Sequence, residues 1–105
     1  MVRGEVFRLR VPLAARGAEQ RGTRFAVVVQ ADELLALSTV LVSPTSQSAP
    51  PRSFRPAIEV AGQPTRVLVE QTTAVTPDRL GDSVGRLSAA ELRDVDVALS
   101  LVLGL

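Results

Sequence analysis

The side chains available for chemistry in this chain are restricted, because it contains neither histidine nor cysteine. The lack of cysteine excludes disulfides, thiolate nucleophiles and cysteine-based metal sites. The lack of histidine removes the side chain most often used for acid–base catalysis near neutral pH, together with Ser-His-Asp triads and the usual zinc sites. Any reaction therefore has to use arginine, carboxylates, hydroxyls and the backbone.

All 12 basic residues are arginine, a preference that a GC-rich genome explains as readily as a function does. Their distribution is more informative. Residues 1–56 carry eight arginines against four acids, whereas residues 57–105 carry four against seven. Guanidinium groups suit phosphate recognition. The basic half therefore suggests an anionic partner, although charge alone does not identify one.

The length of 105 residues predicts a single domain, 1–105, and a core small enough that pairing with a second subunit is a common way to bury more surface. A hydrophobic fraction of 46% with 22% charged residues is typical of globular, soluble chains. No apolar run reaches the about 20 residues that span a membrane, and the N-terminus lacks a signal-peptide core. We therefore expect a cytoplasmic protein with no membrane contact.

Short strands have to position any site in the first two thirds of the chain. Alternation over residues 2–11 and the β-branched run at 24–30 predict two strands, the second buried on both faces. A third strand is expected over 38–45, stopped by Pro44 or shortly after it, behind a short helical turn at 31–36. Strands at 57–60 and 66–70 are expected to form a hairpin through Ala-Gly-Gln-Pro. Two long polar loops, 12–22 and 46–56, separate these elements.

A helix is predicted at the C-terminal end. Ser88 and Glu91 have the spacing of a capping box, Leu87 and Leu92 that of a hydrophobic staple, and Gly104 supplies a stop. Apolar residues continue off the main stripe of this helix, so we expect it to be covered on more than one side, by its own sheet or by a second subunit. The overall expectation is a mainly β fold, with several strands closing into a small barrel, followed by one α-helix.

Several motifs in order along the chain resemble the MazF/PemK family of toxins. They are RGEVF at 3–7, GAEQRGTR at 17–24 followed by AVVVQ, VSPTS at 42–46, VEQ at 69–71, RLG at 79–81 and VGRL at 84–87. The resemblance implies an SH3-like barrel of the MazF/PemK/CcdB type packed as a homodimer. It also implies a sequence-selective endoribonuclease that cuts single-stranded RNA without a metal or other cofactor, in which the ribose 2′-hydroxyl attacks and leaves 2′,3′-cyclic phosphate and 5′-hydroxyl ends. A cognate MazE-like antitoxin would lie over the RNA groove.

The resemblance assigns roles to individual residues. Arg24 and Thr45 occupy the family's catalytic positions, the first to stabilise charge on the phosphorane and the second to hydrogen-bond a nonbridging oxygen. Without the motif, Arg24 reads as a surface or phosphate-positioning residue, and Thr45 equally well as a strand-end residue bonded to local backbone. The residues assigned to RNA binding are Arg3, Glu19, Gln20, Ser46, Gln47 and Gln71.

Alternatives stay open for several of these RNA-binding residues. Glu19 is a conceivable proton acceptor, but an exposed loop carboxylate without a role is the commoner case. Gln71 reads more readily as a structural link between strand and loop than as a base contact. Arg3 fits a contact to the phosphate backbone, and equally an ion pair with Glu5 or another acid.

The chain also departs from the family pattern. Phe25 stands where proline usually follows the catalytic arginine, Thr73 replaces a frequent arginine, and Phe7 replaces tryptophan or tyrosine. Ala18 and Leu68 replace the His and Arg of one branch of the family, so that version of the active site is absent. Two other functions therefore remain: a non-catalytic barrel toxin that grasps a protein such as gyrase, and a decayed toxin that binds only its antitoxin.

Overall fold

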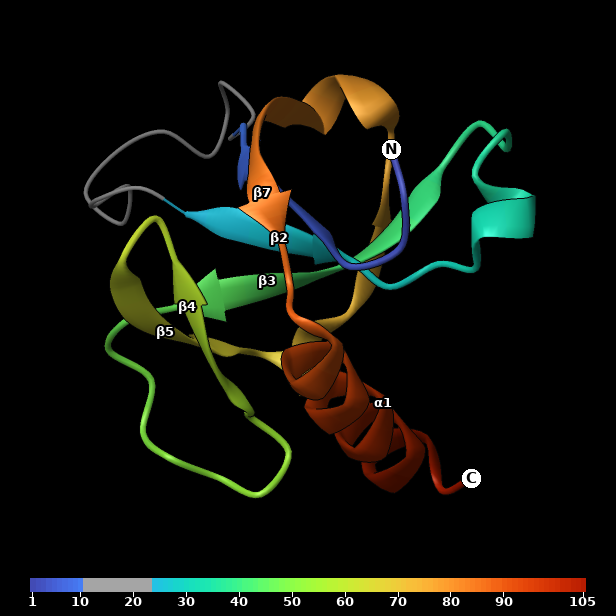
Figure 1. The fold of residues 1–105 in the computed structure, drawn as a ribbon. Helices are drawn as coiled ribbons and strands as arrows, with labels where there is room; N and C mark the ends of the chain where they lie inside the picture. Colours follow the sequence, from blue (N-terminus) through green and yellow to red (C-terminus); the bar gives the residue numbers. More distant parts are fainter. Residues whose placement is uncertain (11–23) are drawn as a thin grey trace.

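The computed structural model describes residues 1–10 and 24–105, and the predicted loop 12–22 lies outside these residues. Strands follow one another closely in the described part, and the chain ends in one helix (Figure 1). The strands are β1 (Glu5–Leu9), β2 (Phe25–Val28), β3 (Val40–Ser46), β4 (Ala57–Val60), β5 (Gln63–Val67), β6 (Thr73–Val75) and β7 (Leu80–Arg86). The 3-10 turns are η2 (Asp32–Leu34), η3 (Val69–Gln71) and η4 (Pro77–Arg79), and the helix is α1 (Ala89–Leu103).

The strands of the described part form one antiparallel sheet in the order β4-β5-β3-β2-β1-β7, with β6 added on β3. This sheet curves as a half-barrel, with α1 packed against it (Figure 1). Its buried apolar side chains form two clusters. The expected mainly β barrel-type fold with a C-terminal helix is confirmed. The strands predicted over 2–11, 24–30 and 57–60 and the turn within 31–36 are also confirmed.

The β2 strand lies at the centre of the sheet and is buried on both faces, as predicted. Val27 contributes to one apolar cluster, which includes Val95 and Ala98 of α1, whereas Ala26 and Val28 contribute to another on the opposite side. Because successive side chains of a strand point to opposite faces, a β-branched run can fill both clusters at once.

The third strand ends at Ser46, shortly after Pro44, as predicted. Residues Val40–Val42 pair with β6, and pairing with β5 begins at Thr45, so Pro44 lies where β3 changes partner. A residue without an N–H is tolerated at that place because no ladder donor is needed there. The Pro44 carbonyl still accepts a hydrogen bond from the Leu68 N–H, at 2.8 Å.

The hairpin of β4 and β5 is tighter than expected. Val60 pairs with Gln63, so only Ala61 and Gly62 form the loop, and both have positive φ, 52° and 78°. These angles are those of a two-residue type I′ turn, whose twist matches that of the strands. Gln63 and Pro64 therefore belong to β5 instead of the turn, and residues 69–71 form η3 instead of the end of a strand.

The helix begins and ends as predicted. The Ser88 hydroxyl accepts from the Glu91 N–H at 3.1 Å, the Glu91 carboxylate accepts from the Ser88 N–H at 2.8 Å, and Gly104 closes the helix with a φ of 71°. The Glu91 carboxylate also accepts the Glu59 N–H at 2.9 Å, which ties the helix start to the edge strand β4. Burial opposes ionisation of Glu91, but these donors lower its pKa below the ordinary value.

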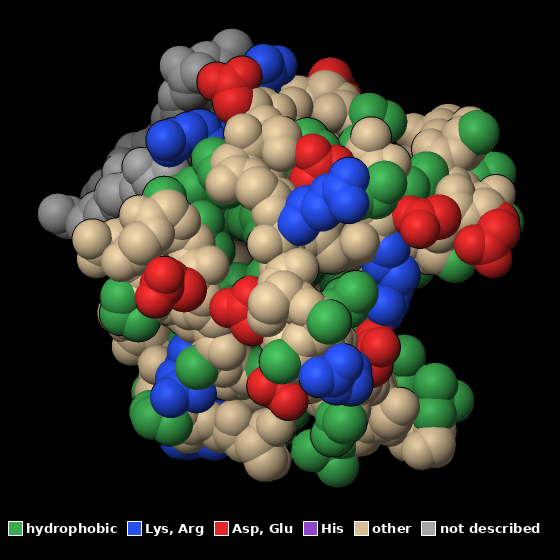
Figure 2. Space-filling view, in the orientation of Figure 1, with side chains coloured by type: hydrophobic (Ala, Val, Ile, Leu, Met, Phe, Trp, Pro, Cys, Tyr) green, Lys and Arg blue, Asp and Glu red, His purple; other side chains and the backbone are tan. Residues whose placement is uncertain are grey.

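One side of α1 remains exposed in the single chain. Val95 and Ala98 are buried, whereas Val97, Leu101 and Leu103 are 57–69% exposed, and apolar side chains gather near the C-terminal end of the helix (Figure 2). The sheet therefore covers only part of the apolar surface that the sequence places on this helix. In the part of the chain that the structure describes, no helix is long and apolar enough to cross a membrane.

Candidate active site

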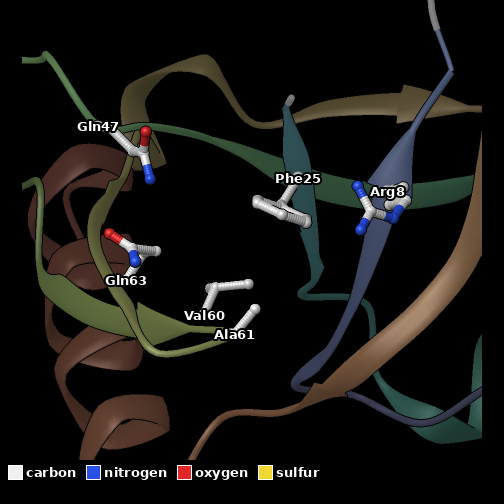
Figure 3. Close-up of a pocket in the computed structure, with 6 residues that line it drawn as sticks. All are labelled: Arg8, Phe25, Gln47, Val60, Ala61 and Gln63. Atoms are coloured by element: carbon white, nitrogen blue, oxygen red, sulfur yellow. The ribbon is translucent and has the colours of Figure 1, made fainter. Parts of the chain in front are cut away.

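A pocket of about 250 Å³ opens where β1 ends, β2 begins and the β4–β5 hairpin turns (Figure 3). The register brings its walls together, because Arg8 pairs directly with Phe25 and Val60 with Gln63. The residues that line it are Arg8, Phe25, Gln47, Val60, Ala61 and Gln63. Side chains from both halves of the sequence therefore meet at one end of the sheet.

The two predicted catalytic residues lie at this end of the sheet. Arg24 immediately precedes Phe25, its side chain is exposed, and its carbonyl accepts the Leu9 N–H at 3.0 Å. Thr45 is 2% exposed, and its hydroxyl donates to the Phe25 carbonyl at 3.3 Å. The fold thus brings Arg24 and Thr45 together through Phe25, although they stand 21 positions apart in the chain.

The environments of these two residues differ. A guanidinium remains protonated at neutral pH, and an exposed one can turn towards a phosphate. The single hydroxyl proton of Thr45 is already bonded to the backbone. This contact is the one expected if Thr45 is a strand-end residue bonded to local backbone. The hydroxyl oxygen keeps acceptor capacity, and its proton could bond a phosphate oxygen only by leaving the Phe25 carbonyl.

The predicted RNA-binding residues are divided between the pocket and other places. Gln47 lines the pocket, and Ser46 precedes it, with its hydroxyl 3.4 Å from that of Ser48. Gln71 lies in η3 and is exposed, and its side chain makes no hydrogen bond to residues 1–10 or 24–105. Glu19 and Gln20 fall outside the described residues.

Arg3 lies at the opposite end of β2 from the pocket. Its guanidinium donates to the Val29 carbonyl at 2.8 Å and to the Asp96 carboxylate at 2.7 Å. These bonds connect the N-terminus to α1, and they correspond to the alternative in which Arg3 pairs with an acid. An RNA contact by Arg3 would have to use the guanidinium donors that these two bonds leave free, or replace the bond to Asp96.

The second long loop is held by an ion pair. The Arg55 guanidinium donates to one oxygen of Glu70 at 2.7 and 2.9 Å and to the Pro50 carbonyl at 3.3 Å, and it lies over the Phe54 ring. Burial opposes ionisation of Glu70, but the bonds and charge of Arg55 and a backbone N–H lower its pKa. The acid of the VEQ motif is therefore a structural anchor for this loop.

Five of the pocket's lining residues are not among the predicted site residues: Arg8, Phe25, Val60, Ala61 and Gln63. Phe25 was noted only as a departure from the family pattern. The expected four-residue turn placed Gln63 in a loop, and only the paired register of β1 with β2 shows that Arg8 lies beside Phe25. The alternation of residues 6–9 was the one signal that set Arg8 apart from its neighbours.

Acidic side chains do not gather as metal ligands within residues 1–10 and 24–105. The expectation that the reaction needs no metal stays a prediction.

Comparisons with known proteins agree with this fold. The profile of the family described as "PemK-like, MazF-like toxin of type II toxin-antitoxin system" matches residues 2–103. A candidate toxin of Mycobacterium tuberculosis is 42% identical over 106 residues, covering 100% of this chain and 99% of the relative, and endoribonuclease MazF9 of the same organism is 34% identical over 116 residues, covering 100% and 98%.

Solved structures agree as well. A mycobacterial endoribonuclease in complex with its cognate antitoxin has a TM-score of 0.81 at 19% identity, with 100% of this chain and 96% of that one covered. At that identity the likeness shows the fold. Together with the family profile over nearly the whole length and the two relatives above 30% identity, it shows that this chain belongs to the PemK-like, MazF-like toxin family of type II toxin–antitoxin systems.

Proposed function

We propose that the protein is a sequence-selective endoribonuclease that cuts single-stranded RNA at the pocket end of the sheet. The observation that carries this proposal is the exposed Arg24 immediately before Phe25, whose ring lines a pocket together with the amides of Gln47 and Gln63 (Figure 3). An RNA backbone passing Arg24 would present its phosphate to a fixed positive charge and its base to the pocket. The relative named endoribonuclease MazF9 supports the same activity.

The reaction needs few groups from the protein, because RNA carries its own nucleophile. The 2′-hydroxyl attacks the adjacent phosphorus and loses its proton to solvent, while the bond to the 5′-oxygen breaks. The 5′-oxygen takes up a proton, so the products are a 2′,3′-cyclic phosphate and a 5′-hydroxyl. The Arg24 guanidinium stabilises the charge that develops on the phosphorane oxygens. We expect Arg24 also to assist protonation of the departing 5′-oxygen, and Thr45 to give up its bond to the Phe25 carbonyl and bind a nonbridging oxygen.

We infer that the active form is a homodimer inhibited by an antitoxin in the cytoplasm. The exposed apolar residues of α1 support a second copy, since such surfaces in small domains are commonly covered by a partner. The complex of a similar fold with its cognate antitoxin supports the second partner. A monomer mass in sedimentation equilibrium would contradict the dimer.

The test is incubation of the purified chain with a long mixed-sequence RNA in EDTA, followed by mapping of the cut ends. We expect discrete cuts with 5′-hydroxyl ends, and a rate about 10²–10³-fold lower for Arg24→Ala, the usual loss when one stabilising donor is removed. Arg86→Ala is the matched control and should cleave normally, because Arg86 is an exposed arginine of β7 that pairs with Glu5, at the end of β1 away from the pocket.

The two roles of Thr45 can be separated in the same assay. A catalytic hydroxyl predicts slow cleavage by Thr45→Val and recovery in Thr45→Ser, whereas a structural one predicts a lower free energy of unfolding with normal cleavage. Intact RNA at high concentrations of wild-type protein, or full activity of Arg24→Ala, would reject the proposed mechanism.

A further inference from the structure

We propose that the pocket holds one unpaired RNA base beside the cleaved phosphate, stacked on Phe25 and read at its edge by Gln47 and Gln63. This inference rests on the proposed function and assigns a base-selecting subsite to it. Phe25, Gln63 and Arg8 thereby become specificity-determining residues, and the residue that departs from the family's proline becomes the stacking platform.

The first argument is the position of the Phe25 ring. Phe25 packs against the apolar cluster under α1, remains only partly buried, and directs its ring into the pocket (Figure 3). The Arg8 guanidinium lies 5.6 Å from the ring centroid, within the range of a cation–π contact. A ring that is held at its base and open in front is the usual surface on which single-stranded bases stack.

The second argument is the opposite wall, where the amides of Gln47 and Gln63 lie across the pocket from Phe25 (Figure 3). Each amide offers a donor and an acceptor, and neither bonds another side chain or the backbone within the described residues. Such groups can bond the polar edge of a base while its face lies on an aromatic ring. Val60 and Ala61 supply the apolar surface between these two walls.

The third argument is size and distance. A volume of about 250 Å³ is below the range of pockets that hold drug-sized ligands, and it suits one planar ring system. Phe25 follows Arg24 directly, so their Cα atoms lie about 3.8 Å apart, and a base on this ring would belong to a nucleotide near the phosphate that Arg24 contacts. The pocket therefore selects a base adjoining the cut.

The experiment uses short single strands of 2′-fluoro RNA, which lack the nucleophile and cannot be cut. Binding selection from a random pool with the wild-type chain should show a base preference at one position that Phe25→Leu and Gln63→Leu both remove. By fluorescence anisotropy, Phe25→Leu should raise the Kd for the selected strand about tenfold, whereas Phe25→Tyr should retain binding.

An abasic scan links the residue to the base. Removing the base at the preferred position should raise the Kd of the wild-type protein about as much as Phe25→Leu does. In the Phe25→Leu protein, removing the same base should raise the Kd by less than about twofold. Phe7→Leu is the matched control, because Phe7 is equally half-buried but packs on the other side of the sheet, and its RNA affinity should not change.

The outcomes separate this inference from the proposed function. If the losses of affinity from Phe25→Leu and from an abasic site simply multiply at every position of the strand, Phe25 contacts no particular base. That result would overturn the base pocket, even if wild-type protein cuts natural RNA. Coupling at one position would support the pocket, even if wild-type protein cuts nothing. Equal effects of Phe7→Leu and Phe25→Leu would also overturn it, because they would show that folding alone is affected.

Discussion

Two arginines in this protein lie over phenylalanine rings at nearly the same distance, 5.5 Å for Arg55 over Phe54 and 5.6 Å for Arg8 over Phe25. Arg55 also bonds the carboxylate of Glu70 and a backbone carbonyl, so its charge is neutralised inside the fold. Arg8 is exposed, and no carboxylate of the described residues lies within ion-pair distance of it.

The difference shows that the same pair of residue types can serve opposite purposes. Around Arg55 the contacts fix the loop after β3, and the charge is paired with the Glu70 carboxylate. Around Arg8 the contact stops at the ring, and the positive charge remains available at a pocket. Burial and acid partners, not the arginine–phenylalanine contact itself, separate an anchor from a recognition site.

Among the substitutions that test this comparison, Arg55→Met should change stability most. Methionine keeps much of the side-chain volume but removes the hydrogen bonds. Because the Glu70 carboxylate, partly buried, would lose its charged partner, we expect the free energy of unfolding to fall by about 2 kcal/mol. Urea unfolding measures this loss. A double cycle with Glu70→Gln should show strong coupling, and additive losses would mean that the two groups do not act as a pair.

Arg8→Met should change stability less than Arg55→Met does, and it should weaken RNA binding. The exposed cation–π contact contributes about 0.5–1 kcal/mol, so unfolding should change by no more than that. The Kd for uncut single-stranded RNA should rise several-fold, and the slope of its logarithm against that of salt concentration should shrink by about one. If Arg8→Met destabilised the protein as much as Arg55→Met and left RNA affinity normal, Arg8 would be a structural anchor and the contrast with Arg55 would be wrong.

The smallest effect is the pH dependence of the Glu70 anchor. The pKa of Glu70 is lowered in the folded chain, so its stabilisation is complete above the ordinary value of 4.5 and is lost as pH falls through the folded-state value. Glu70→Gln should therefore be less stable than wild type at pH 7 and closer to it in acid. The lowered pKa values of Glu5 and Glu91 should leave some acid sensitivity in the variant. A constant gap between the two proteins from pH 7 to pH 3 would contradict this assignment.

The elements that could be predicted are those whose local pattern agrees with their packing. The β2 run fills two apolar clusters, and the signals around Ser88, Glu91 and Gly104 set both ends of α1. The β6 and β7 strands were not predicted. β7 contains two glycines and several exposed residues, and its pairing with β1 shifts register, so tertiary pairing and not side-chain alternation defines it.

The candidate site was predictable only in part, for a similar reason. Arg24 and Thr45 could be assigned because they belong to motifs, but the bond from Thr45 to the Phe25 carbonyl depends on how β2 aligns with β3. The pocket depends on the registers of two strand pairs, β1 with β2 and β4 with β5, in which Phe25 and Val60 stand 35 positions apart in the chain. Such neighbours are a property of the folded sheet, and no local spacing in the sequence encodes them.

The tight hairpin turn has a consequence for how this protein could diverge. Ile58 and Val60 anchor β4 in the core, whereas Ala61, Gly62 and Gln63 are exposed, and two of the three border the pocket. Ala61 already holds a left-handed backbone conformation that glycine or asparagine adopts more easily, so replacement there need not weaken the fold. After a gene duplication, copies could acquire new target sequences through substitutions at this tip while inheriting an unchanged core.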